Sequence, residues 1–316
     1  MASRKSARRG KKSGIGKFVV IGAVLIALGA GGFLMFGDRD SGNVTESGIS
    51  DLIPGMDGTS ESPADSARPA QSLAQVQMLL TEVSASLATG EEKAREGALR
   101  DGYQRLATLL ESPLPLEERE RAIELFHAIT DELFLSNAHN EFSENYTVKS
   151  GDSFDRIARK FSISNNLLYD LNKRPRGNAN LHPGENLKVP KGAPRVVVRK
   201  GDFTTSLYFG DNLVRQYIVA HGKNDNTPVG SSTITSMGID PEKSSRGAND
   251  PVNEMKLRWI GLANYAGGRT GIGFHGTQYL DSIPGMTSRG CIRMRDHDVV
   301  ELYDILRIGN KVEVRA

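Results

Sequence analysis

One uninterrupted apolar run near the N-terminus constrains this chain most. Residues 18–36 (FVVIGAVLIALGAGGFLMF) carry no charge, and at 1.5 Å per residue a helix of this length nearly spans a bilayer core of about 30 Å. A cleaved signal peptide is the alternative, because Ala27-Leu28-Gly29 offers a weak cleavage site. Its apolar core would be shorter than this run, which continues through Phe36. The pattern therefore favours an uncleaved transmembrane anchor.

The distribution of charged residues predicts how this anchor is oriented in the membrane. Residues 1–17 hold seven basic side chains and no acid, so the rest of the chain has 40 − 7 = 33 basic against 38 acidic residues. The positive-inside rule makes 1–17 a basic cytoplasmic tail and places everything after the anchor outside the membrane, an extracytoplasmic location that the resemblances given below would make the periplasm or cell wall. A folded part of net negative charge matches nucleic-acid binding poorly, and we expect no nucleic-acid partner.

Two segments of different character follow the anchor. Residues 37–70 are rich in Gly, Ser, Pro and Asp, which predicts a flexible linker. Residues 71–138 predict a small α-helical bundle, because apolar residues recur there at helical spacing in three runs, the last beginning at Pro115. These runs contain Leu73, Val76, Leu80, Val83 and Leu87, then Leu99, Tyr103, Leu106 and Leu110, then Ile123, Phe126, Ile129 and Leu133. The sequence does not indicate what the bundle does.

Residues 145–191 predict a compact βααβ unit. A strand and turn (NYTVKSGDS) lead into a helix that carries Phe154, and a second short helix and a returning strand (HPGENLKVP) follow. The whole segment resembles a LysM domain, a module that binds N-acetylglucosamine-containing glycans such as peptidoglycan. The resemblance implies a glycan groove between the first turn and the loop before the last strand, formed by Gly151, Asp152, Ser153, Phe154, Asn180 and Leu181. The residues themselves require only a turn and a helix cap at the first of these places.

Residues 195–316 predict a mainly-β domain. Apolar and polar residues alternate in 195–199, 206–209 and 213–220, around a hairpin turn at Gly210-Asp211-Asn212. Further strands are expected at 233–237, 257–262 and 311–315, and a helix at 299–306, while glycines crowd 261–290. The chain is therefore expected to be multidomain, with a transmembrane helix, a helical bundle, an α+β module and a mainly-β domain.

The single cysteine of the chain, Cys291, lies 16 residues after His275. With one cysteine no internal disulfide can form, and a thiol nucleophile needs a histidine to accept its proton. The polar or small neighbours Ser288, Arg289, Gly290 and Arg293 are unlike those of a core strand, and two arginines would lower the pKa of the thiol. Gly290 would allow a tight backbone whose N–H groups hold an oxyanion.

Two other interpretations of Cys291 exist. Free cysteine packs well as a small buried hydrophobe, so a structural thiol is the first alternative. A zinc site is the second, but Cys291 with His275 and His297 gives no recognisable ligand spacing. We therefore expect no metal and no cofactor.

The motifs TPVG (227–230), RWIGL (258–262), GIGFHGT (271–277) and SRGCIRM (288–294) resemble the catalytic domain of YkuD-type L,D-transpeptidases. The family pairs His-Gly with Ser-x-Gly-Cys about 14 to 17 residues later. The resemblance implies that Cys291 is the nucleophile, His275 the base, and the Gly276 carbonyl the group that orients the imidazole. Gly290 and Cys291 N–H groups would form the oxyanion hole. Ser288, Arg289 and Arg293 would contact substrate, although Arg293 could equally form a structural ion pair.

The resemblance also implies a reaction. The thiolate would attack a peptidoglycan tetrapeptide stem, expel D-alanine, and pass the acyl group from a thioester to an amine of a neighbouring stem, forming a 3→3 cross-link. Water as acceptor would make the enzyme an L,D-carboxypeptidase, and a protein amine would make it a protein-anchoring transpeptidase. Inactivation by carbapenems is implied too. The alternative from another class is a non-catalytic tether that joins membrane and peptidoglycan through the LysM domain.

Overall fold

The computed structural model describes residues 73–88, 92–239, 256–263 and 271–316, all of which belong to one compact unit, Pro63–Ala316. The expected cytoplasmic tail 1–17, anchor 18–36 and linker 37–70 lie outside the described residues. Within the described ranges, no helix is both long and apolar enough to cross a membrane.

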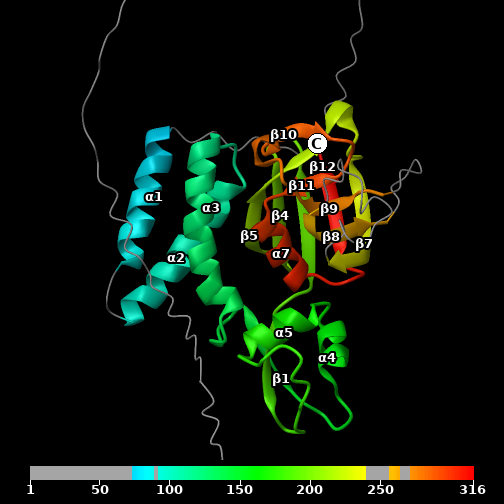
Figure 1. Ribbon diagram of the computed structural model, residues 1–316. Coiled ribbons are helices and arrows are strands. Elements are labelled where there is room, and N and C mark those ends of the chain that lie inside the picture. The colour runs from blue at the N-terminus through cyan, green and yellow to red at the C-terminus, as the bar shows by residue number, and fades with distance from the viewer. Residues whose placement is uncertain (1–72, 89–91, 240–255, 264–270) are drawn as a thin grey trace, which may run out of the picture. The chain divides into compact units, whose positions relative to one another are not determined.

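Three amphipathic helices form the first folded layer (Figure 1). They are α1 (Leu73–Leu87), α2 (Glu92–Leu110) and α3 (Leu116–Thr130), and α3 continues as one π-helical turn, η1 (Asp131–Leu135). The periodic apolar residues of the sequence are the ones that pack: Val76, Leu80 and Val83 of α1 are buried with Leu106 of α2 and Phe126 of α3. Pro115 directly precedes α3, with Glu117 and Glu118 in its first turn, where the helix dipole favours negative charge.

The expected βααβ unit is present. Strands β1 (Ser143–Thr147) and β2 (Asn186–Pro190) pair antiparallel and flank α4 (Phe154–Lys160) and α5 (Asn165–Leu171). Serine side chains cap both helices, because Ser153 accepts the Arg156 N–H and Ser164 accepts the Leu167 N–H. The Lys191 N–H donates to the Phe142 carbonyl at 3.0 Å, so the unit begins and ends at the same place.

The rest of the chain is mainly β, as the alternating pattern predicts. A sheet of ten strands runs in the order β10-β6-β11-β9-β8-β7-β12-β3-β4-β5 among the described residues. Its strands are β3 (Pro194–Arg199), β4 (Thr204–Phe209), β5 (Asn212–Ile218), β6 (Ala220–Gly222), β7 (Gly230–Ile239), β8 (Lys256–Leu262), β9 (Gly273–Gly276), β10 (Gly285–Ser288), β11 (Ile292–Met294) and β12 (Lys311–Arg315). Helix α7 (Asp296–Ile305) buries Val299, Leu302 and Ile305 against it. Short 3₁₀ turns, η2 (Lys223–Asp225) and η3 (Leu280–Ser282), connect strands.

The helical layer is joined to the sheet through polar groups of edge strand β5. Arg215 of β5 is 2% exposed and forms ion pairs with Asp131 of η1 and Glu301 of α7. Arg119 of α3 donates to the Gln216 side chain at 2.9 Å, and His127 Nε2 lies 3.0 Å from the Gln216 carbonyl. Strand β5 lies beside α3 (Figure 1), so α3 covers this edge of the sheet.

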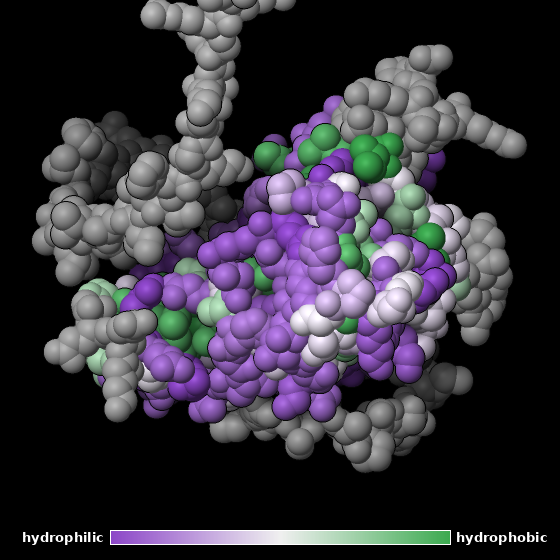
Figure 2. All heavy atoms as spheres, turned by 90° about the horizontal axis from the view of Figure 1, so that it is seen from below, coloured by the Kyte–Doolittle hydropathy of each residue, from purple (hydrophilic) through white to green (hydrophobic). Residues whose placement is uncertain are grey.

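The molecular face in Figure 2 is mostly hydrophilic, with hydrophobic residues only in small separate groups. Individual apolar side chains do reach solvent, among them Tyr279, Leu280 and Met286 beside η3 and β10. Scattered exposed apolar residues are normal for a soluble folded unit and do not by themselves mark a site.

Candidate active site

Neighbouring strands bring Cys291 and His275 to one face of the sheet. Strand β11 begins directly after Cys291 and runs parallel to β9, with Arg293 opposite His275. Cys291 stands two residues before Arg293, so an extended chain there would turn its side chain to the face that carries His275. The short glycine-rich strand β9 thus carries the histidine to the cysteine.

His275 is held in one tautomer. Its Nδ1 lies 2.7 Å from the Gly276 carbonyl oxygen, and because a carbonyl only accepts, Nδ1 must carry the proton. The hydrogen bond expected between His275 and Gly276 is therefore present, and it leaves Nε2 as the proton acceptor. The imidazole is 3% exposed, and this burial lowers its pKa, which the Gly276 hydrogen bond only partly opposes. His275 is accordingly a neutral base.

The thiol of Cys291 lies in a less polar setting than the sequence predicts. Burial raises its pKa, and a hydrogen bond from the Gly273 N–H only partly offsets this. The Sγ atom donates to the Gly271 carbonyl at 3.5 Å. The expectation that Arg289 and Arg293 lower the pKa is wrong: the Arg289 side chain is exposed, and burial of Cys291 outweighs any attraction. The raised pKa of Cys291 and the lowered pKa of His275 favour a neutral thiol and a neutral imidazole at rest.

The loop before the cysteine is tied by its own hydrogen bonds. The Ser288 hydroxyl donates to the Cys291 carbonyl at 2.6 Å and accepts the Gly290 N–H at 3.0 Å. Ser288 is buried, so it shapes the loop here and does not present its side chain to a substrate. The Gly290 N–H points to Ser288, which corrects the expectation that this amide helps to form the oxyanion hole. Of the two expected donors, the Cys291 N–H is therefore the one that remains for the oxyanion.

The two arginines of the motif differ in how far their side chains are exposed. The Arg293 side chain is 7% exposed, its Nη1 lies 3.4 Å from the Thr287 hydroxyl, and burial lowers its pKa. Arg289 is exposed on the loop between Ser288 and Gly290. Arg289 can therefore meet a substrate directly, whereas Arg293 mainly supports the strand that carries it.

The single tryptophan of the chain, Trp259, lies beside the site although the sequence alone indicates no role for it. Trp259 lies directly opposite His275 across β8 and β9, with ring centroids 6.3 Å apart. A Cβ on Gly273 would come within 2.8 Å of the indole, and one on Gly261 within 2.6 Å. The glycines of the GIG and WIG motifs are therefore the sequence feature that could have indicated this contact, because they leave room for the indole beside the histidine.

The residues expected to bind glycan gather at one end of the βααβ unit, but they differ in accessibility. Asp152 accepts hydrogen bonds from the Lys149 N–H and the Tyr146 hydroxyl, both at 2.8 Å. Gly151 has a φ of 84°, a turn conformation that favours glycine. Phe154 is wrong as a side-chain contact, because it is 2% exposed and stacks on Tyr169 at 4.3 Å in the core.

The remaining members of that set lie on the surface or cap a helix. Asn180 is exposed, and its carbonyl accepts from Arg174 at 2.6 Å, while Leu181 is half-buried. Ser153 is occupied as the cap of α4. Asn180 and Leu181 are thus the residues of this set left to reach a ligand with their side chains, since Asp152, like Ser153, is already hydrogen-bonded.

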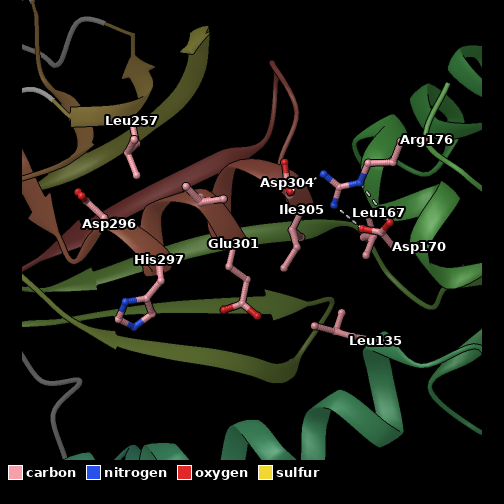
Figure 3. A pocket seen from close by; sticks show the side chains of 11 residues that line it. Leu135, Leu167, Asp170, Arg176, Leu257, Asp296, His297, Glu301, Asp304 and Ile305 are labelled. Atoms are coloured by element: carbon pink, nitrogen blue, oxygen red, sulfur yellow. Dashed lines mark hydrogen bonds and ion pairs between the residues drawn. The ribbon is translucent and has the colours of Figure 1, made fainter. Parts of the chain in front are cut away.

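A large cavity lies elsewhere in the described part of the chain (Figure 3). Its volume is about 630 Å³, and Arg176 extends between Asp170 of α5 and Asp304 of α7, at 2.6 and 2.8 Å. The lining residues are Leu135, Leu167, Asp170, Arg176, Leu257, Asp296, His297, Val300, Glu301, Asp304 and Ile305. It contains neither Cys291 nor His275. Among the described residues, no three His, Cys, Asp or Glu side chains are arranged to hold a metal ion.

Comparison with known proteins agrees with this geometry. Residues 193–314 match the YkuD family, described as the L,D-transpeptidase catalytic domain, and residues 146–190 match the LysM domain. The Bacillus subtilis protein YkuD, named provisionally as an L,D-transpeptidase, is 30% identical over 177 residues, which cover 54% of this chain and 97% of YkuD. The chain belongs to the YkuD-type L,D-transpeptidase family.

Two further relatives of this L,D-transpeptidase family member can be compared with it. YqjB of Bacillus subtilis, with the same provisional naming, is 34% identical over 125 residues, covering 38% of this chain and 70% of YqjB. A solved L,D-transpeptidase from Mycobacterium smegmatis has 20% identity and a TM-score of 0.30, over 42% of this chain and 64% of that one. The chain thus spans less than two thirds of that solved structure, and the family assignment rests on the sequence matches.

Proposed function

We propose that this protein is a membrane-anchored cysteine L,D-transpeptidase that cross-links peptidoglycan stem peptides. The observation that carries the catalytic part is the hydrogen bond from His275 Nδ1–H to the Gly276 carbonyl. It leaves Nε2 as the proton acceptor, on a strand that pairs with β11 directly after Cys291. The family match supplies the substrate class.

The first half-reaction is acylation of the thiol. His275 Nε2 takes the Cys291 proton, and the sulfur attacks the carbonyl carbon of the third residue of a tetrapeptide stem. The tetrahedral oxyanion is stabilised by the Cys291 N–H. When the peptide bond breaks, the imidazolium returns its proton to the nitrogen of the departing D-alanine. A thioester on Cys291 and a neutral His275 remain.

The second half-reaction releases the product. A side-chain amine of a neighbouring stem attacks the thioester carbonyl, and His275 removes the proton that the amine loses. Collapse of the tetrahedral intermediate expels the sulfur, which regains a proton from the imidazolium. Because the free thiol has a raised pKa and the imidazole a lowered one, proton transfer accompanies attack and no stable ion pair precedes it. The new bond is a 3→3 cross-link.

Two further parts of the proposal concern location. Residues 18–36 would hold the protein in the membrane, which the sequence pattern alone supports. The LysM domain would keep it on the glycan strands, for which the family match to residues 146–190 is the support. Sedimentation with purified peptidoglycan tests the second part: Asn180→Ala and Leu181→Ala should weaken binding, whereas Glu144→Gln, on the exposed part of β1, should not.

The catalytic part is tested by incubating the purified protein with disaccharide-tetrapeptides and following products by mass spectrometry. We expect D-alanine release together with cross-linked dimers, and loss of both in Cys291→Ala. His275→Gln should retain the thiol but lose most of the rate, whereas His182→Gln, an exposed histidine of the LysM domain, should behave as the parent protein.

Other outcomes point to the alternatives. Tripeptide without dimers would identify an L,D-carboxypeptidase, and dimers formed only with a protein amine would identify a protein-anchoring transpeptidase. No D-alanine release, or release undiminished in Cys291→Ala, would refute the proposed chemistry and favour a non-catalytic tether.

A further inference from the structure

Three backbone segments, around Gly222, Thr227 and Gly290, lie in close contact next to the nucleophile. A Cβ on Gly222 would come within 2.8 Å of the Thr227 nitrogen and 2.9 Å of the Gly290 Cα. A Cβ on Gly290, whose φ is 143°, would come within 3.0 Å of the Asn226 carbonyl oxygen. The segment around Thr227 therefore packs directly against the residue that precedes the nucleophile.

One hydroxyl joins these segments. The Thr227 Oγ1 accepts the Gly222 N–H at 2.8 Å and donates to the Gly290 carbonyl at 2.8 Å. The direction is fixed, because the Gly222 amide can only donate and the Gly290 carbonyl can only accept. Thr227 is fully buried, so water does not compete for either bond.

The Gly290 carbonyl belongs to the same peptide unit as the Cys291 N–H. In a planar trans peptide these two groups point in opposite directions. A hydrogen bond that fixes the carbonyl toward Thr227 therefore fixes the Cys291 N–H on the other side of the peptide plane. That amide is the donor assigned above to the oxyanion, since the Gly290 N–H is bonded to Ser288.

The main-chain carbonyl of Thr227 is itself held by a buried lysine. The Lys200 ammonium is 7% exposed, donates to the Thr227 carbonyl at 3.0 Å and pairs with Asp225. The main chain of Thr227 is thus anchored to the turn that follows β3 and, through Asp225, to η2, while its side chain reaches the cysteine loop. Such an arrangement supports one orientation of the Gly290–Cys291 peptide, and preorganised donors of this kind are effective because they do not reorient during reaction.

We propose that Thr227 is a positioning residue that aims the Cys291 N–H at the oxyanion formed during thiol acylation. It rests on the proposed function, because only acyl transfer at Cys291 creates that oxyanion. The threonine does not touch the reacting atoms; it acts through the Gly290–Cys291 peptide.

The test compares Thr227→Val, which keeps the shape and removes the hydroxyl, with Thr227→Ser, which keeps the hydroxyl. The full chain is assayed for D-alanine release from disaccharide-tetrapeptides and for alkylation of Cys291 by iodoacetamide across pH. Alkylation needs the thiolate but forms no oxyanion. Thr227→Val should therefore lower kcat by about 10²-fold, with KM and the pH profile of alkylation unchanged. Thr227→Ser should restore kcat to within about threefold of the parent protein, because it again supplies the hydroxyl.

A matched control is Thr205→Val. Thr205 of β4 is equally buried, and its hydroxyl has no hydrogen-bond partner among the described residues. A kcat of Thr227→Val equal to that of Thr205→Val would overturn the proposal. Equal losses in acylation and alkylation would also overturn it, since they would indicate general damage to the fold. If the parent protein alkylates but releases no D-alanine, the proposed function itself fails, a result distinct from both.

Discussion

Replacing Arg215 with methionine should destabilise the catalytic domain by about 3 kcal/mol. The guanidinium is 2% exposed and pairs with Asp131, which is 63% exposed, and Glu301, which is 34% exposed. Removing one partner of a buried ion pair costs about 3–5 kcal/mol, because the other charge is left uncompensated. Asp131 can regain water, whereas the less exposed Glu301 would retain its hydrogen bond from the Tyr217 hydroxyl at 2.9 Å. The lower end of that range is therefore expected.

Urea unfolding followed by tryptophan fluorescence measures this effect. Trp259 is the single tryptophan of the chain and lies in β8, so it reports on the catalytic domain. With an m-value of about 2 kcal/mol/M, the midpoint should fall by about 1.5 M. Arg105→Met is the control: Arg105 pairs with Glu82 while 35% exposed, and such surface pairs contribute about 0–1 kcal/mol.

A double-mutant cycle with Glu301→Gln separates the ion pair from simple packing. If the pair carries the stability, the double variant should be clearly less destabilised than the sum of the two single variants. Additive effects, or an Arg215→Met midpoint no lower than that of Arg105→Met, would refute the reasoning. Arg215→Met more stable than the parent would show that desolvation of the guanidinium outweighs its attraction to the acids.

Two buried ionisable groups near β5 and α7 should affect stability in opposite pH ranges. Burial lowers the pKa of His127 to about 4, below its ordinary value. Its stabilisation is complete above pH 6.5 and lost as the pH falls toward 4, by about 3 kcal/mol, and His127→Gln should remove this acid dependence. Burial raises the pKa of Asp298 to about 6. Its contribution is complete below pH 3.8 and lost as the pH rises through 6, so Asp298→Asn should stabilise the protein by about 1–3 kcal/mol at pH 7.5.

Urea midpoints from pH 4 to pH 8 check both expectations, each variant against the parent protein. His139→Gln is a control for the first, because it changes a histidine that lies outside the β5 contacts. If the urea midpoint of His127→Gln falls at acid pH as steeply as that of the parent protein, the imidazole must be charged in the folded protein. For Asp298→Asn, a benefit at pH 4 as large as at pH 7.5 would show that ionisation is not the cause.

The sequence predicts the elements whose patterns are local. Helices α1–α3 begin and end near the residues that their apolar spacing indicates, and the LysM resemblance gives both strands and both helices of that unit. The strands that carry the site are harder to predict. β9, β10 and β11 are three or four residues long and contain Gly273, Gly276 and Gly285, so neither alternation nor propensity marks them. The family motif finds His275 and Cys291 where periodicity cannot.

Properties that depend on long-range contacts could not be predicted. The pKa of Cys291 follows from how deeply the folded sheet buries the thiol, and the adjacent arginines in the sequence suggested the opposite direction. The contact between the helical layer and the sheet was equally unpredictable, because Arg119 and the residue it binds, Gln216, are 97 positions apart in the sequence. Ser288 looked like a substrate contact, yet its hydroxyl is occupied within its own loop.

The closeness of the two ends of the LysM unit makes it an insertion in another domain. Helices α1–α3 precede it and β5 follows it, yet α3 and β5 bind each other directly through Arg119 and Gln216. Since the Lys191 N–H already meets the Phe142 carbonyl, a short linker could join the flanking residues, but it would remove the ion pairs of Arg176 with Asp304 and of Arg307 with Asp155. The contacts between α3 and β5 also imply that a fragment starting at residue 195 would expose Arg215 and the edge of β5. Such a fragment would be prone to aggregate. The LysM unit and the helices are thus both bonded to the catalytic domain, and removing either one would leave charged groups of that domain without their partners.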